Sequence, residues 1–363
     1  MTIKTKKQKI IVGLSGGVDS AAALILLKKQ GFNPIGVTLK LPRWGKNKKE
    51  NANSHSQSIE IAQKICRKFK IPYFVIDAAK DFDKKVVNYF ITELKNNRTP
   101  NPCVVCNRDF KFKKLFEIAK KFKANYVATG HYARLRQQNP KIKNQKPKYE
   151  LLTAKDKKKD QSYMLSGLSQ KDLSKIILPL GNLTKDEAYK ITKKEGLNFF
   201  KRIKQSQDFC FVSGKLLTKF LKEQVGAKKG KIIDENGNIL GTHEGRHFFT
   251  IGQRKGIKLP NGPYFVFGFD KKKNIVYVTK NKKNLFKKEI IVYPSHLISN
   301  EKLKKPINAL VKTRYQQEST PAKIIPQGNK LKIIFKKPVF SPTPGQFAVF
   351  YKKEICLGNG VIN

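Results

Sequence analysis

The stretch from residue 10 to residue 29 constrains the fold more than any other part of the chain. It begins with the apolar run Ile10-Ile11-Val12, continues through the turn Gly13-Leu14-Ser15-Gly16-Gly17 and ends in a series of good helix formers up to Lys29. This order predicts a buried parallel strand, a tight loop and the N-terminus of a helix. Such a loop presents free backbone N–H groups and the positive end of a helix dipole, so it indicates a site for a phosphate or another oxyanion.

The loop differs from the common nucleotide-binding signatures. A Walker loop carries a lysine that reaches the terminal phosphates, whereas this chain has Val18-Asp19-Ser20 at that point. The dinucleotide fingerprint Gly-x-Gly-x-x-Gly does not match either. The six residues from Ser15 to Ser20, Ser-Gly-Gly-Val-Asp-Ser, resemble the pyrophosphate loop (PP-loop) of the N-type ATP pyrophosphatases, which cleave ATP to AMP and pyrophosphate. That resemblance implies ATP as a substrate and Mg²⁺ near Asp19; a plain glycine-rich turn is the alternative.

Short apolar runs and helical patterns alternate through the first part of the chain. The elements predicted after the first helix are strands at 34–39, 72–77 and 125–131 and helices at 59–69 and 82–94. Residues 42–58 are expected to be irregular. The alternation predicts an open parallel α/β sheet with its ligands at the carboxyl ends of the strands, near Ser15, Leu39 and Gly130.

The pattern changes to short β segments beyond Gly214. A hairpin with an Asn-Gly turn is predicted at 231–241, and further β segments are expected at 248–256 and 264–278. Strand-like runs separated by Gly and Pro follow from Ile290, which indicates a small closed barrel. We therefore expect three domains: a PP-loop catalytic domain at 1–213, a central β-rich domain at 214–282 and a C-terminal β-barrel at 283–363.

The chain is strongly basic, with 76 Lys and Arg against 26 Asp and Glu and a formal net charge of +50. Such a field favours polyanions, either nucleic acid or an acidic membrane surface. Compositional drift in an AT-rich genome is the alternative explanation, and charge alone does not choose between them. The apolar runs are shorter than the roughly 18 residues of a spanning helix. The 5 cysteines fit a reducing compartment, so we expect a cytoplasmic protein without a membrane partner.

The segment from Arg98 to Arg108 contains two prolines and a Cys-x-x-Cys pair, Cys103 and Cys106. The prolines predict a fixed loop before a helix near Lys113. The two thiols can share a metal, form a redox pair or place one thiol beside a basic group. A zinc site needs two more ligands of similar spacing, which the sequence lacks, so no zinc site is predicted. Cys210 follows a polar Ser-Gln-Asp, which is compatible with a buried or a reactive thiol.

Five motifs together resemble the bacterial tRNA-specific 2-thiouridylase family. They are the PP-loop, Thr99-Pro-Asn-Pro-Cys-x-x-Cys-Asn107, Ala128-Thr-Gly-His-Tyr-Ala133, Lys159-Asp-Gln-Ser-Tyr163 and Thr250-Ile-Gly-Gln-Arg-Lys-Gly256. Thr313-Arg-Tyr315 and Pro344-Gly-Gln346 extend the similarity toward the C-terminus. The resemblance therefore runs from the first predicted strand to the last.

This resemblance implies ATP-dependent conversion of the wobble uridine of tRNA to 2-thiouridine. Adenylation would make the C2 oxygen a leaving group, and a cysteine desulfurase or sulfur-relay protein would supply sulfur as a persulfide on Cys210. Cys106 matches the family's nucleophile and would release that sulfur, with a Cys106–Cys210 disulfide, AMP and pyrophosphate as products. The base would be flipped out of the single-stranded anticodon loop.

The same resemblance implies a set of binding residues. Those expected at ATP are Gly13, Leu14, Ser15, Gly16, Gly17, Val18, Asp19, Ser20, Leu39 and Gly130. Asn101, Pro102 and Cys103 are expected at the target base. Further tRNA contacts are expected from His131, Lys159, Asp160, Gln161, Arg314, Tyr315 and Gln346. The central domain at 214–282 is also expected to contact tRNA.

Two other enzyme types and one binding module remain as alternatives. Many family members carry aspartate where Cys103 stands, and others carry cysteine. Cys103, Cys106 and Cys210 could therefore hold a [4Fe-4S] cluster in an iron–sulfur-dependent thiolase. Another PP-loop ligase, such as an amidotransferase or an argininosuccinate-type ligase, would need neither the paired thiols nor this charge. An RNA-binding module without catalysis would account for the charge but not for the intact PP-loop.

Overall fold

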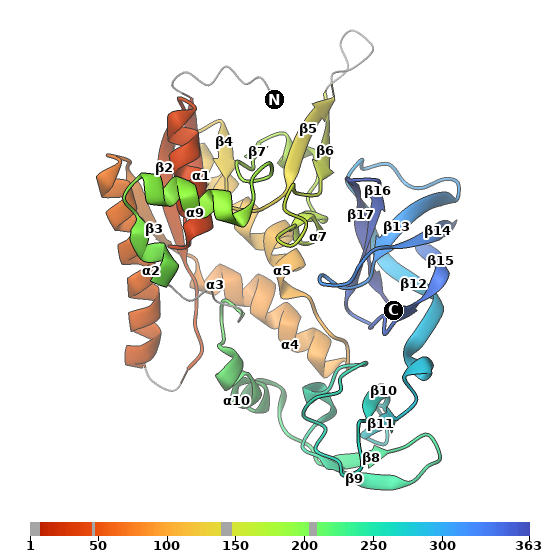
Figure 1. Ribbon diagram of the computed structural model, residues 1–363. Helices are drawn as coiled ribbons and strands as arrows, with labels where there is room; N and C mark the ends of the chain where they lie inside the picture. The colour runs from red at the N-terminus through yellow and green to blue at the C-terminus, as the bar shows by residue number, and fades with distance from the viewer. Residues whose placement is uncertain (1–7, 46–47, 139–146, 203–208) are drawn as a thin grey trace.

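The computed structural model describes residues 8–45, 48–138, 147–202 and 209–363 (Figure 1). An α/β domain lies on the left of the view, a β-barrel on the right and a small β-rich domain at the bottom. Within the described residues, no helix has both the length and the apolar character needed to cross a membrane.

A parallel sheet forms the centre of the α/β domain, with the strand order β3-β2-β1-β4-β7. Its strands are β1 (Lys9–Gly13), β2 (Asn33–Lys40), β3 (Tyr73–Asp77), β4 (Tyr126–Ala128) and β7 (Ile176–Ile177). Strand β1 pairs in parallel with β2 on one side and with β4 on the other. The strand order therefore reverses at β1, and in such sheets the ligand site lies where the order reverses. The predicted open parallel sheet is confirmed.

The helices of this domain extend beyond the predicted ranges. Their bounds are α1 (Val18–Lys29), α2 (Lys48–Lys68), α3 (Ala79–Phe82), α4 (Asn88–Lys95), α5 (Pro102–Val105), α6 (Phe112–Lys121), α7 (Ser162–Leu165), α8 (Gln170–Leu173) and α9 (Lys185–Lys194). A π-helix at Asp83–Val87 joins α3 to α4, and another at Cys106–Lys111 joins α5 to α6. A 3-10 helix follows at Asn198–Arg202.

Two expectations for these helices were wrong. Residues 42–58 were expected to be irregular, but α2 begins at Lys48, because Pro42 and Gly45 precede it and the polar residues that follow tolerate a helix. The loop expected before Lys113 is helical from Pro102 onward. Proline is well tolerated at the first helical position, where its missing N–H would have no intrahelical partner. The side-chain oxygen of Asn101 caps the helix by accepting a bond from the N–H of Val104 (3.4 Å).

The C-terminal barrel is closed, as predicted. Its strands are β12 (Phe286–Leu297), β13 (Ile307–Lys312), β14 (Thr320–Gln327), β15 (Lys330–Phe340), β16 (Phe347–Lys352) and β17 (Ile355–Ile362). Pairing of β12 with both β15 and β17 closes the barrel. Strand β17 also pairs with β6 (Lys148–Leu152) of the α/β domain, which itself pairs with β5 (Arg134–Gln138). One continuous sheet therefore joins the two domains.

The central domain begins with α10 (Gly214–Val225) and contains a four-stranded sheet in the order β10-β11-β8-β9. Its strands are β8 (Gly230–Ile233), β9 (Ile239–His243), β10 (Phe265–Asp270) and β11 (Ile275–Thr279). The antiparallel pairing of β8 with β9 confirms the predicted hairpin. The β segment expected at 248–256 was wrong, because this stretch makes local turns such as the bond from the Gln253 N–H to the Thr250 carbonyl (2.9 Å). Short 3-10 helices lie at Arg246–Phe248 and Lys282–Leu285.

Candidate active site

The PP-loop lies between the carboxyl end of β1 and the first residue of α1, as predicted. Gly16 has a φ of +74°, and a Cβ atom there would lie only 2.5 Å from the main-chain oxygen of Ser58, so only glycine fits. The Ser20 hydroxyl donates to the Gly17 carbonyl (2.9 Å) and accepts from the Ser15 N–H (3.2 Å). Ser20 therefore holds the loop from inside, whereas the Ser15 side chain is exposed.

Asp19, the residue expected near Mg²⁺, is bonded to two side chains from distant segments. The Tyr132 hydroxyl donates to one carboxylate oxygen (2.7 Å), and the Lys185 ammonium donates to both oxygens (2.7 Å each). Desolvation and the Asp19 charge raise the pKa of Tyr132, so its hydroxyl stays protonated and remains a donor. Sequence reasoning missed both partners. Tyr132 belongs to the motif from Ala128 to Ala133, but no role was predicted for its side chain. The sequence spacing does not connect Lys185 with the PP-loop.

Gly130 lies against the first turn of α1. A Cβ atom at this position would come within 2.6 Å of the Asp19 carbonyl carbon, so glycine is needed for the turn after β4 to approach the PP-loop. Leu39 lies near the carboxyl end of β2, beside the same end of β1. The structure therefore brings the expected ATP-binding segments to one edge of the sheet.

The segments that carry Cys106 and Cys210 pack together. Cys106 is buried and belongs to the same apolar cluster as Phe211, the residue after Cys210. The Trp44 N–H donates to the Phe211 carbonyl (2.7 Å), which fixes this segment beside the chain that leaves β2. Cys103 and Cys210 have exposed side chains, and all five cysteines are free thiols. The Ser-Gln-Asp sequence before Cys210 lies outside the described residues.

The three thiols share one electrostatic environment. Desolvation raises the pKa of Cys103 and of Cys106, and it raises that of Cys210 to about 12. Cys103 and Cys210 have exposed surface, yet the protein around their sulfur atoms still disfavours the thiolate. The Cys106 and Cys103 thiols also raise the pKa of Cys210, so both lie within electrostatic range of it.

Lys111, at the end of the π-helix that begins with Cys106, opposes this rise. Its charge lowers the pKa of Cys103, Cys106 and Cys210. Together with desolvation, it also holds the pKa of His131 well below its usual range, so that ring is neutral. The His131 Nδ1 lies 2.7 Å from the Thr129 hydroxyl. Lys111 was not singled out from the sequence, although a cation beside a thiol is a usual device for activating it.

The described residues do not include any group of three His, Cys, Asp or Glu side chains arranged to hold a metal ion. Cys103, Cys106 and Cys210 therefore do not form a ligand set as they are placed here.

The segment expected at the target base is partly buried. Asn101 is 9 % exposed, and its side-chain oxygen caps α5. Pro102 is buried as the first residue of that helix, whereas Cys103 is exposed. Gln346 of the barrel donates to the carbonyls of Thr99 (3.0 Å) and Pro100 (3.3 Å). Its amide therefore holds the preceding loop.

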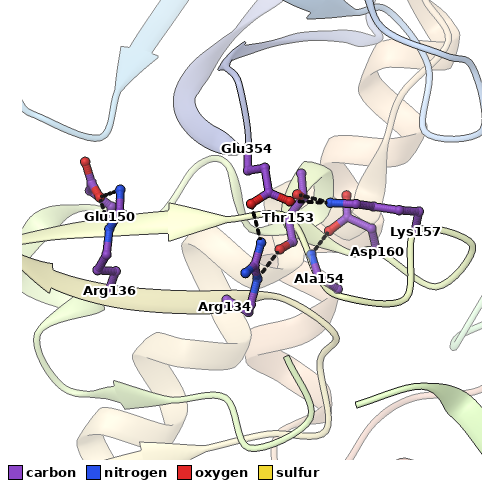
Figure 2. Close-up of polar contacts among 8 residues, drawn as sticks. All are labelled: Arg134, Arg136, Glu150, Thr153, Ala154, Lys157, Asp160 and Glu354. Carbon is purple, nitrogen blue, oxygen red and sulfur yellow. Dashed lines mark hydrogen bonds and ion pairs between the residues drawn. The ribbon is translucent and has the colours of Figure 1, made fainter. Parts of the chain in front are cut away.

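The Lys159-Asp160-Gln161 segment has both internal and accessible parts. Asp160 is buried and accepts from the N–H groups of Ala154 (2.9 Å) and Ser162 (3.2 Å), the first of which is drawn in Figure 2. The side-chain oxygen of Gln161 accepts from the Tyr132 N–H (2.9 Å), which connects this segment to the residue that bonds Asp19. Lys159 is partly exposed, and among the described residues it is not paired with a carboxylate.

Arg314 and Tyr315 lie where the barrel meets its neighbours. One guanidinium nitrogen of Arg314 donates to the Ile251 carbonyl (2.8 Å) of the central domain and to the Ser341 hydroxyl (3.0 Å). Arg314 is thus committed to the junction between the barrel and the central domain. The Tyr315 ring packs 6.0 Å from the Tyr163 ring. Desolvation raises the Tyr315 pKa, and the charges of Asp160 and Cys103 contribute, so Tyr315 lies near both.

A clamp of charged side chains fixes the barrel to the α/β domain (Figure 2). Glu354, in the turn between β16 and β17, accepts from Arg134 (2.8 Å) and from Lys157 (2.7 Å). Arg134 also donates to the Thr153 carbonyl (2.8 Å). Lys157 of the clamp belongs to the same loop as Lys159 and Asp160. The clamp therefore also positions residues of the candidate tRNA site.

Comparison with known proteins places the whole chain in one family. Profiles described as the tRNA methyl transferase HUP domain, the tRNA methyl transferase PRC-barrel domain and the aminomethyltransferase beta-barrel domain match residues 8–214, 218–280 and 287–362. The tRNA-specific 2-thiouridylase MnmA 1 of Geobacillus kaustophilus is 37 % identical over 366 residues, which cover 99 % of this chain and 96 % of that protein. The chain belongs to the tRNA-specific 2-thiouridylase family.

A second 2-thiouridylase, MnmA of Halothermothrix orenii, is 39 % identical and covers 98 % of both chains. Among solved structures, the U34-tRNA thiolase NcsA of Methanococcus maripaludis, with its [4Fe-4S] cluster, covers 61 % of this chain and 68 % of its own at 19 % identity and a TM-score of 0.36. A likeness that weak supports no inference about the chemistry of this 2-thiouridylase family member.

Proposed function

We propose that this chain is an ATP-dependent tRNA-uridine 2-sulfurtransferase. It adenylates the C2 oxygen of the wobble uridine and replaces it with sulfur from a cysteine persulfide, giving 2-thiouridine, AMP and pyrophosphate. The observation that carries this proposal is the packing of the Cys106 helix against the Cys210 segment in the domain that also holds the PP-loop. The family membership of the chain supports the same reaction.

The PP-loop residues bind ATP. Backbone N–H groups at the start of α1 and the positive end of its dipole suit the phosphates, and Leu39 and Gly130 line the adenosine. Asp19 offers a carboxylate at this point, which fits Mg²⁺ because that ion uses one or two carboxylates together with substrate phosphates. When bound, Mg²⁺ neutralises charge on the departing pyrophosphate.

The two cysteines carry the sulfur. A cysteine desulfurase or a sulfur-relay protein loads Cys210 as a persulfide. The Cys106 thiolate then attacks the inner sulfur of Cys210, so that a Cys106–Cys210 disulfide forms and hydrosulfide leaves. The hydrosulfide attacks the adenylated C2 atom, and AMP departs with the original oxygen. Two equivalents of an external thiol then reduce the Cys106–Cys210 disulfide and are themselves oxidised to a disulfide.

The residues around the thiols place the tRNA. In the expected contact set, Cys103 is exposed, and His131, Lys159 and Tyr315 are partly exposed. Asn101, Asp160, Gln161, Arg314 and Gln346 shape the surface through internal bonds. We assign the domains to 1–213, 214–282 and 283–363, with the central domain also contacting tRNA. A cytoplasmic location fits this substrate.

An iron–sulfur route is the second candidate, because Cys103, Cys106 and Cys210 influence one another electrostatically. As placed in this structure, the three thiols do not form a ligand set, so the proposed reaction does not use a cluster.

The test combines purified protein, ATP, tRNA lacking the modification and a persulfide donor. Mass spectrometry of the tRNA should show 2-thiouridine, with one AMP and one pyrophosphate for each thiolation. Cys106→Ser and Cys210→Ser should abolish thiolation yet still bind ATP, because a hydroxyl can neither carry a persulfide nor attack one. Cys66→Ala, which removes a thiol from a different apolar cluster, is the matched control and should remain active. Release of ADP and orthophosphate would contradict the proposal.

A further inference from the structure

The ammonium of Lys185 lies 2.7 Å from each carboxylate oxygen of Asp19. The Lys185 side chain is only 12 % exposed, against 35 % for Asp19. An ammonium that has lost most of its water needs compensation, and in this structure the PP-loop carboxylate supplies it. A largely buried cation therefore lies in direct contact with the PP-loop.

The backbone that carries this lysine is firmly held. Lys185 is the first residue of α9, which begins with a capping box between Thr184 and Glu187. The Lys185 N–H donates to the Asp156 carboxylate (3.0 Å). The ammonium is therefore presented to the PP-loop from a fixed helix end.

The charges around Asp19 favour an anion. The first turns of α1 and α9 both lie beside this carboxylate, since Asp19 belongs to α1 and Lys185 to α9. Each helix brings the positive end of its dipole, and a lysine in a first turn opposes the dipole of its own helix. Asp156 and Glu187 already cap the start of α9, so the uncapped N-terminus of α1 and the Lys185 ammonium are the positive groups that would stabilise a second anion here.

We propose that Lys185 binds the pyrophosphate part of ATP and takes the place of the lysine that Walker loops carry within the loop itself. The inference rests on the proposed function and adds a residue to it. Before ATP binds, Asp19 holds the ammonium at the loop. When the nucleotide arrives, the ammonium bonds to phosphate oxygens and stabilises the charge that the leaving pyrophosphate develops. Tyr132 continues to donate to Asp19 and keeps that carboxylate oriented.

The first test measures binding of ATP, pyrophosphate and AMP by titration calorimetry. Lys185→Ala should weaken the binding of ATP and pyrophosphate about 10- to 100-fold, the usual effect of one hydrogen bond to a charged group. AMP should bind as it does to the wild type. Lys185→Arg should retain part of the affinity. Lys190→Ala, an exposed lysine of the same helix, is the matched control and should behave as the wild type.

A second test uses the native lysine and covers the case in which Lys185→Ala fails to fold. In buffer with EDTA, Asp19→Asn should strengthen pyrophosphate binding, because the competing carboxylate is gone. The double variant Asp19→Asn/Lys185→Ala should lose that gain. An unchanged pyrophosphate affinity for Asp19→Asn would overturn the proposal.

A purely structural role for the Lys185–Asp19 ion pair would give different results. If Lys185→Ala lowers only the melting temperature, or weakens AMP and pyrophosphate binding equally, Lys185 is a structural residue and the inference is wrong. The proposed function can fail separately. If the wild type does not thiolate tRNA but pyrophosphate binding depends on Lys185, then the sulfur chemistry is wrong and this inference stands.

Discussion

The side-chain amide of Gln346 donates a hydrogen bond to the main-chain oxygen of Thr99 (3.0 Å). Gln346 belongs to the barrel and Thr99 to the loop before Asn101. Two further bonds join the same parts: the Thr99 N–H donates to the Pro344 carbonyl (2.7 Å), and Arg98 donates to the Ile362 carbonyl (3.0 Å). The barrel therefore acts as a template for the segment expected at the target base.

Replacing Gln346 should impair thiolation through this loop. Gln346→Ala removes the bonds to the Thr99 and Pro100 carbonyls, so we expect a stability loss of about 1–2 kcal/mol and a lower kcat/KM for tRNA. ATP affinity should be unchanged. Gln346→Glu should be worse, because a carboxylate cannot donate to a carbonyl and repels it. Gln327→Ala, at an exposed position of the barrel, serves as control. Full activity of Gln346→Glu would contradict the template role.

Cys103 separates the two sulfur-transfer routes. If sulfur passes as a persulfide, Cys103→Asp should keep much of the activity, because the resemblance implies that relatives carry aspartate there. If a cluster operates, Cys103→Ala should lose iron, brown colour and activity together. The variants are purified anaerobically, and their iron content, sulfide content and thiolation activity are measured. A colourless, iron-free protein that thiolates tRNA supports the persulfide route, and activity strictly dependent on reconstituted iron would overturn it.

Lys111 should control the reactivity of the thiols. Desolvation raises the pKa of Cys106 and Cys210, and the Lys111 charge partly offsets the rise. Lys111→Ala should raise both pKa values further, so less thiolate forms at a given pH and alkylation by iodoacetamide slows. The pH profile of alkylation should move to higher pH. Lys113→Ala, which removes a lysine paired with Asp109 (3.5 Å), should leave the profile in place. Faster alkylation of Lys111→Ala would disprove this role.

Glu354 should make the domain junction sensitive to acid. Hydrogen bonds from Lys157 and Arg134 lower its pKa from 4.5 to about 2. A carboxylate whose pKa is lowered in the folded state stabilises the protein at pH values above its ordinary pKa of 4.5. That stabilisation is lost as the pH falls from 4.5 toward 2. Because Glu354 is 51 % exposed, we expect less than about 1 kcal/mol. Urea unfolding should show Glu354→Gln to be less stable than the wild type at pH 6, and the difference should shrink near pH 2. An equal difference at both pH values would contradict the assignment.

The binding of tRNA should depend steeply on salt. If the charge of +50 acts on the phosphate backbone, affinity should fall roughly 10³-fold or more between 50 and 200 mM salt for about six phosphate contacts. Lys159→Ala should reduce the slope of log Kd against log salt by about one. Filter binding or fluorescence anisotropy measures both effects. Equal affinity for tRNA and an unrelated duplex of the same length would favour the compositional explanation of the charge.

The sequence by itself determined the strand, loop and helix of the PP-loop, because an apolar run, glycines and helix formers act locally. The hairpin at β8 and β9 was predictable for the same reason. The start of α2 was not, since its polar first turns carry no apolar periodicity. The helix from Pro102 was missed because a proline that ends one helix can also begin another.

Only the tertiary structure decided which side chains meet. The pairing of Lys185 with Asp19, the bond from Gln346 to Thr99 and the buried role of Asp160 join residues from different elements. So does the β17–β6 pairing that merges the barrel with the α/β domain. Local propensity and periodicity report the conformation of a segment and the face that it buries. They do not report the partner that satisfies a given charge or amide, because that partner is fixed by how the domains pack.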